Sequence, residues 1–188
     1  MPATVEDCKG MLLSAIEDNN PVVFLEHRWV HYVKANIPRG YLKTPIDGPK
    51  RLWQGDAVTV VSSSYMSLEA LHAAKVLSAE GCDVDLFDLR VVRPLNLEDI
   101  VSSVKRTGRL LVVDTGWKTM GPGAEIVAQV VEHCFDSLKR PPQRLGLPDY
   151  PTPSSRSLAS AFYPRAEHIA LALGDLAGIS SAAISRTA

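Results

Sequence analysis

Short apolar segments alternate with helical repeats along most of the chain after Asp56. Three strand segments and three helix segments follow one another in the order 57–62, 67–79, 84–89, 97–106, 109–114 and 123–135. Each strand segment is short, apolar and bounded by polar residues, whereas apolar residues recur every three to four positions in the helix segments. Because right-handed crossovers place helices on both faces of a parallel sheet, this order predicts a three-layer α/β/α domain.

Further elements are expected on both sides of this region. Thr4 is a typical helix N-cap, so a helix is expected from there to the Asn-Asn-Pro stop at 19–21. Buried strands are expected at 21–27 and 143–147, and a last helix at about 165–173. The sheet is therefore predicted to be mainly parallel, with five strands, and to be preceded by an N-terminal helix-strand arm.

The segment 28–55 contains proline, glycine, lysine and aromatic residues without a sustained period. It is longer than the roughly 12 to 15 residues that usually limit an unstructured connection inside a compact domain. The chain is therefore divided into a first unit at 1–27, a linker or arm at 28–55, an α/β domain at 56–175 and a flexible tail at 176–188.

Composition excludes several classes of partner. The net charge of −1 gives no basic field for nucleic acid or for an anionic membrane surface. No apolar run approaches the roughly 20 residues of a membrane span. Cys8, Cys82 and Cys134 are far apart, which argues against a disulfide framework and fits a reducing cytoplasm.

The glycine-rich loop at 121–123 offers the first candidate site. Backbone N–H groups at a helix start can hold a phosphate, and Gly121 and Gly123 stand where the next helix begins. The position that a third glycine would take in a dinucleotide fingerprint is Ile126, and the first-turn Glu125 would repel an anion. A structural loop or a subunit contact is the preferred interpretation.

Arg90 and Arg93 stand where the strand at 84–89 ends. Ligands of open α/β sheets bind at this edge, so both arginines are candidate ligand contacts. A buried ion pair with Asp88 or Asp114 is the alternative, and it is preferred. Neither the His27 and His31 pair, for which no third metal ligand is visible, nor the serines at 62–64, which lack a nucleophile elbow, completes a catalytic site.

Several motifs occur together in the order of a known family. They are a strand with Asp-Leu-Arg-Val-Val-Arg-Pro-Leu at 88–95, the segment at 105–113, Gly-Pro-Gly-Ala-Glu-Ile at 121–126, a proline-rich turn at 149–155 and Asn-Pro-Val-Val-Phe-Leu-Glu-His at 20–27. In combination the chain resembles the transketolase-type C-terminal domain of the beta subunit of thiamin-diphosphate-dependent 2-oxoacid dehydrogenases, the pyruvate and branched-chain class. The resemblance extends from about Thr4 to Leu173, and it makes 1–27 the end of the preceding pyrimidine-binding domain.

This resemblance implies a part of an enzyme that performs oxidative decarboxylation of a 2-oxoacid such as pyruvate. Thiamin diphosphate and magnesium would serve the complete enzyme, but the activating glutamate and the diphosphate ligands of the family lie outside this chain. The chain alone is therefore expected to bind neither group and to be inactive.

The implied role is subunit assembly. The expected partners are an alpha subunit or another cofactor-binding chain, a second copy of this chain, and in large complexes a lipoyl acyltransferase core. Trp117 to Met120 is the expected contact surface, together with an apolar patch on the first helix and strand. Lys139 and Arg140 replace a family carboxylate and argue against docking of a basic acyltransferase domain.

Two further interpretations remain. One is a non-catalytic assembly module of a transketolase-like split enzyme outside any dehydrogenase complex. The other is a small-molecule regulatory domain that uses the strand ends near Arg90 and Gly121.

Overall fold

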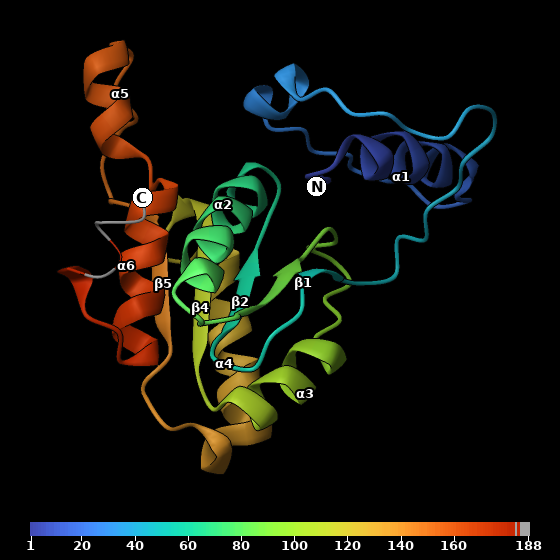
Figure 1. Ribbon diagram of the computed structural model, residues 1–188. Helices are drawn as coiled ribbons and strands as arrows, with labels where there is room; N and C mark the ends of the chain where they lie inside the picture. Colours follow the sequence, from blue (N-terminus) through green and yellow to red (C-terminus); the bar gives the residue numbers. More distant parts are fainter. Residues whose placement is uncertain (183, 185–188) are drawn as a thin grey trace.

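The computed structural model describes residues 1–182 and 184, which form a layered α/β domain with an N-terminal arm (Figure 1). The helices are α1 (Val5–Glu17), α2 (Tyr65–Ala79), α3 (Glu98–Thr107), α4 (Pro122–Cys134), α5 (Arg156–Phe162) and α6 (Ala166–Ala177). The strands are β1 (Lys50–Trp53), β2 (Thr59–Ser62), β3 (Asp85–Asp88), β4 (Leu110–Trp117) and β5 (Gln143–Leu147), and two short 3₁₀ helices are η1 (Arg28–Tyr32) and η2 (Phe135–Ser137).

The five strands form one sheet in the order β1-β3-β2-β4-β5. The last four are parallel, with Thr59 of β2 opposite Asp85 of β3 and Leu110 of β4, whereas β1 is antiparallel to β3. Every residue of β2 and β3 is buried, as expected for strands covered on both faces. The predicted α/β class and the mainly parallel five-stranded sheet are confirmed.

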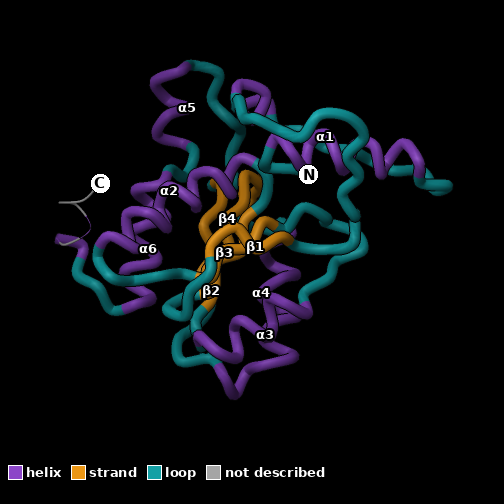
Figure 2. Tube along the Cα trace, turned by 45° about the vertical axis from the view of Figure 1, so that its right-hand side comes forward, coloured by secondary structure: helices purple, strands orange, loops and turns teal. Residues whose placement is uncertain are grey.

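Two hydrophobic cores lie on the two faces of the sheet. Val60 of β2 and Leu111 of β4 pack with α2 and α6, whereas Val61 and Val112, one position further along each strand, pack with α3 and α4. Figure 2 shows these helix pairs on opposite sides of the strands. The alternation follows from the two-residue period of a strand, and it gives the predicted three layers.

One predicted strand is not formed, and one strand of the sheet lies where none was predicted. The segment 21–27 forms no strand, and Val23 and Leu25 in it are exposed, because no strand in the described part of the chain lies beside it to pair with its backbone. The fifth strand is β1, which lies in the predicted linker. β1 pairs with β3 through a bulge between Arg51 and Trp53, and its two cations suit a sheet edge.

The C-terminal part differs from the prediction as well. α5 was not predicted, and α6 continues past Gly174 to Ala177. Ile184, in the segment for which a flexible tail is predicted, packs into the core formed by α2 and α6. Residues 183 and 185–188 of the predicted tail lie outside the described residues.

Aromatic contacts attach the arm to the domain. His27 stacks on Tyr65 of α2, while Trp29 meets both Tyr65 and Tyr163 edge to face. The Arg165 guanidinium lies 4.9 Å from the Trp29 ring centre, a cation–π contact. The arm thus crosses from its own helix α1 to the carboxyl side of the sheet, where it contributes to the edge described next.

Candidate functional site

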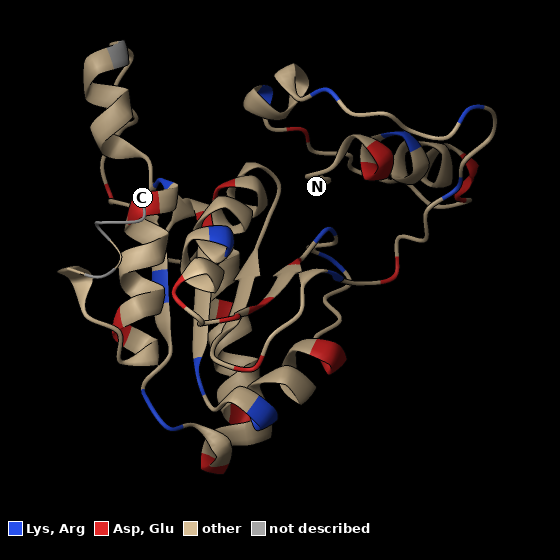
Figure 3. Cartoon of the chain, in the orientation of Figure 1, with Lys and Arg blue, Asp and Glu red and all other residues tan. Residues whose placement is uncertain are grey.

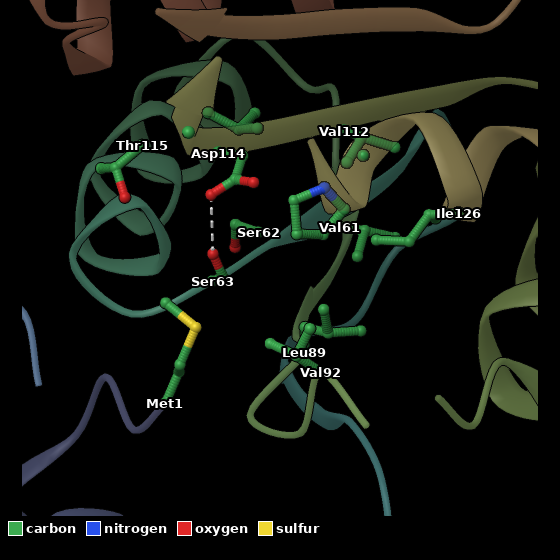
Figure 4. Close-up of a pocket in the computed structure, with 14 residues that line it drawn as sticks. Met1, Val61, Ser62, Ser63, Leu89, Val92, Val112, Asp114, Thr115 and Ile126 are labelled. Carbon is green, nitrogen blue, oxygen red and sulfur yellow. Dashed lines mark hydrogen bonds between the residues drawn. The ribbon is translucent and has the colours of Figure 1, made fainter. Parts of the chain in front are cut away.

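The carboxyl ends of β2 and β4 enclose a cavity of about 240 Å³ (Figure 4). From β2 the chain passes through α2 to β3 on one side, and it then crosses to β4 on the other side of β2. The two connections leave the sheet in opposite directions, and such a topological switch point opens the crevice in which α/β proteins bind ligands. Topology therefore explains why the cavity lies here.

The polar wall of the cavity comes from the ends of these two strands. Ser63 follows β2, and its hydroxyl donates a hydrogen bond of 3.3 Å to Oδ1 of Asp114 in β4. Thr115 and the backbone of Gly116 continue this wall. The opposite wall is apolar and includes Leu89, Val92 and Ile126, while Met1 lies at one side of the opening in Figure 4.

The glycine loop has a structural role. A side chain at Gly121 would collide with the Trp117 carbonyl oxygen, so the tight return from β4 to α4 requires glycine at this position. Gly123 lines the cavity and packs against Val112. Glu125 is exposed and accepts a hydrogen bond of 2.7 Å from Gln129, which places its charge on the outer side of α4.

Arg90 is a structural residue that joins the arm to the domain. Its side chain is buried, its Nη1 atom lies 3.5 Å from Asp7 Oδ1 of α1, and its Nε donates to the Gly48 carbonyl at 3.0 Å. The expected ion pair with Asp88 or Asp114 is wrong, because the arm supplies the counter-charge from 83 positions earlier in the chain. Arg93 is exposed beside a groove that the arm forms with the segment after β3.

Asp88, at the end of β3, is a carboxyl group with almost no access to water. Ser67 donates a hydrogen bond of 2.8 Å to Oδ1, while Oδ2 has no hydrogen-bond partner in the described part of the chain. Burial, reinforced by the charge of Asp7, raises the pKa of Asp88 to about 6, although the Ser67 hydroxyl and the Met1 ammonium act in the opposite direction.

Asp88→Asn is expected to stabilise the protein at pH 7.5 by about 2 kcal/mol. The folded-state pKa of Asp88 lies above its unfolded value near 3.8, so the native state holds the proton more tightly and stability falls as pH rises from about 4 to 6. Urea unfolding across pH 4 to 8 should show the gain of the variant at neutral pH and its disappearance near pH 4. A gain of equal size at all pH values would contradict the assignment, and the exposed Asp99→Asn is the matched control.

Lys139 and Arg140 lie at the other end of the sheet. Both are exposed, and the Lys139 amide donates a hydrogen bond of 2.8 Å to the carbonyl of Gly108, just before β4 begins. The structure thus separates the candidate residues into three places. Arg90 and Arg93 adjoin the arm, Trp117 to Glu125 surround the loop after β4, and the two cations lie at the amino end of β4.

Other candidate groups form no further reactive cluster in the described part of the chain. His27 stacks on Tyr65, and burial lowers its pKa, whereas His31 lies 3.5 Å from Glu26. The three cysteines are free thiols. Among residues 1–182 and 184, no three histidine, cysteine or acidic side chains converge as metal ligands, and no helix is long and apolar enough to cross a membrane.

The cavity was not predicted as a unit, although its parts were visible. Ser63 was considered as one of three serines without a nucleophile elbow, and Asp114 as a possible ion-pair partner of arginine. The available signal was that both residues directly follow apolar strand segments, since the carboxyl ends of parallel strands meet at one edge of the sheet. Which two strands are neighbours depends on the topology, which the sequence order alone does not reveal.

The doubly wound sheet and its family motifs define a class of domain. A family model described as the transketolase C-terminal domain matches residues 49–169, and the chain belongs to this family. The matched region begins just before β1 and ends in α6, so the fifth strand is part of the family domain. The resemblance inferred from the motifs is confirmed.

Similar proteins include beta subunits of pyruvate dehydrogenase E1 components and of an acetoin oxidoreductase. Pyruvate dehydrogenase E1 component subunit beta of Porphyra purpurea is 40% identical over 159 residues, covering 85% of this chain and 48% of that protein. The beta subunit of acetoin:2,6-dichlorophenolindophenol oxidoreductase from Cupriavidus necator is 35% identical over 171 residues, covering 91% and 51%. The chain therefore spans about half the length of these relatives and corresponds to their C-terminal domain portion.

A solved structure has the same fold. The inactive beta4 tetramer of a split-gene transketolase aligns with a TM-score of 0.71 and 22% identity, covering 95% of this chain and 57% of that one. At this level of identity the similarity concerns the fold alone. It extends over the arm as well as the α/β domain.

Proposed function

We propose that this chain is the subunit-assembling C-terminal portion of the beta subunit of a thiamin-diphosphate-dependent 2-oxoacid dehydrogenase. The observation that carries the proposal is the similarity to pyruvate dehydrogenase E1 beta subunits over 85% or more of the chain, at 36 to 40% identity. The chain would contribute a rigid domain to a larger enzyme that decarboxylates a 2-oxoacid such as pyruvate.

The chemistry of the cavity supports a division of labour between chains. A diphosphate needs cationic side chains or free backbone N–H groups. The start of α4 reaches the cavity, but Pro122 there has no N–H group. Asp114 is the charged side chain in the cavity wall, and neither lysine nor arginine lines the cavity in the described part of the chain. The residues present therefore do not fit the cofactor. Thiamin diphosphate and magnesium would be held in the complete enzyme by residues of other chains.

Two exposed apolar surfaces support the assembly role. Trp117 and Met120 project from the loop after β4, with 56% and 96% of their surface exposed. Ile16, Val23 and Leu25 form exposed positions on the arm. Large exposed apolar side chains on a soluble domain mark interaction sites, so we assign the first surface to the alpha subunit and the second to another copy of this chain.

Co-expression with an alpha subunit of the same enzyme class tests the assembly proposal. Size-exclusion chromatography with light scattering should show a complex, and the double variant Trp117→Ser/Met120→Ser should weaken it at least ten-fold. The control is Phe135→Ser, which removes an apolar side chain of intermediate exposure, 69%, from η2 at the other end of α4. Separate elution of the unmodified chains would overturn the proposal.

A second assignment is a non-catalytic module of a transketolase-like split enzyme. The observation in its favour is the pair of exposed cations Lys139 and Arg140, because a basic acyltransferase domain would be repelled there. Binding of the assembled complex to a lipoyl acyltransferase core distinguishes the two assignments. Binding supports the dehydrogenase, and assembly without any binding to the core supports the split enzyme.

A further inference from the structure

The size and position of the cavity between the ends of β2 and β4 are those of a ligand site and not those of a packing defect. Its 240 Å³ lie slightly below the roughly 300 to 1,000 Å³ of typical ligand pockets, so the occupant would be small. Its position at the topological switch point is the one at which open α/β sheets bind ligands.

The electrostatics of the cavity select the charge of that occupant. Asp114 belongs to the wall, and its Oδ1 receives one weak hydrogen bond of 3.3 Å from Ser63. The Met1 ammonium and the Arg144 guanidinium lie nearby, but both donate to other acceptors. The Met1 ammonium donates to the Arg90 carbonyl at 2.7 Å, and Arg144 donates to the Lys118 carbonyl at 2.7 Å. The carboxylate therefore has capacity for a further donor, and it disfavours an anion.

The remaining surface selects the rest of the ligand. Leu89, Val92 and Ile126 form an apolar wall opposite the acid, as Figure 4 shows. The hydroxyl of Thr115 lies on the polar side, where it can accept a second hydrogen bond from the same donor group. A ligand with a short hydrocarbon body and one ammonium group could donate hydrogen bonds to the polar wall and pack against the apolar wall.

We propose that this cavity binds a small organic monocation, a primary amine with a short apolar body, through the carboxylate of Asp114. The ammonium would donate to Asp114 and Thr115, and the hydrocarbon would lie against Leu89, Val92 and Ile126. The site is formed by this chain alone, so the proposal stands independently of any partner subunit and of the dehydrogenase assignment.

Three probes of nearly the same shape test the charge selection: n-butylammonium, n-butanol and butyrate. In amide NMR titrations, butylammonium should produce saturating shifts at Ser63, Thr115 and Gly123, with an affinity at least ten-fold above that for the other two probes. Equal affinities, stronger binding of butyrate, or no saturable shift with any probe would each overturn the proposal.

Two variants separate the acid from the cavity itself. Asp114→Asn should remove the preference for the cation, whereas Asp136→Asn in η2 should leave it unchanged. Val92→Phe fills the cavity without touching the acid and should abolish binding of all three probes, which keeps the test valid if the first variant does not fold. Retention of the full cation preference in Asp114→Asn contradicts the assigned role.

Discussion

Asp85→Ala is expected to destabilise the domain by about 3 kcal/mol. Asp85 is fully buried at the start of β3, where Ser103 of α3 donates a hydrogen bond of 2.6 Å to it. Arg51 lies 2.9 Å from its other oxygen, and Arg106 pairs with it as well. The loss lies at the lower end of the range for buried ion pairs because both arginines are nearly half exposed and can regain water.

Urea unfolding checks this value. Ser103 also contacts Thr59 at 2.8 Å, so removal of the carboxylate leaves a buried hydroxyl network between β2 and α3 without its acceptor. Asp85→Asn keeps an acceptor for Ser103 and should recover part of the loss. The control is Asp83→Ala, an exposed acid two positions earlier, and an equal loss in both alanine variants would contradict the account.

Asp7→Ala is expected to release α1 and the arm from the domain. Asp7 is 1% exposed and accepts hydrogen bonds from Lys50 at 3.0 Å and from the buried Arg90. Without Asp7, the nearest remaining carboxylate to Arg90 is that of the exposed Asp47 at 3.8 Å. A buried cation that loses its main partner costs several kcal/mol in general, and about 2 kcal/mol is expected here because the arm can detach.

Hydrogen exchange measures the release directly. A loss of about 2 kcal/mol corresponds to roughly 30-fold faster exchange of the α1 amides, whereas amides of β2 should keep their protection. Glu6→Ala is the matched control, since Glu6 is the neighbouring acid and lies 3.6 Å from the same Lys50. Unchanged exchange in α1 of Asp7→Ala would show that the arm is held by other contacts.

The parallel strands and their helices could be predicted because the sequence patterns that indicate them are local. Apolar runs such as that of β4 and the period of α4 identified the parallel strands and their helices, with errors of a few residues at the ends. β1 was not predicted, because Lys50 and Arg51 leave this edge strand without an apolar pattern. The segment 21–27 has a strand composition, but a strand also needs a partner, and composition does not supply one.

Contacts between residues far apart in the chain could not be predicted from the sequence. The partner of Arg90 is Asp7, and the counter-charges of Asp85 come from β1 and α3, so both ion pairs depend on the folded arrangement. Charges are spread over the helices and loops in Figure 3, which agrees with the absence of any blocked charge run in the sequence. The candidate assembly surface at Trp117 was identified from the family motif, and the cavity at Asp114 only from the topology.

The central claim is that this chain serves subunit assembly, whereas residues of other chains bind the cofactor and carry out its chemistry. Calorimetric titration of the purified chain with thiamin diphosphate and magnesium tests the claim most directly. For the chain alone, the expected heats are those of dilution, because Asp114 lines the cavity and neither lysine nor arginine does so among residues 1–182 and 184. Saturable binding in the micromolar range by the chain alone would contradict it.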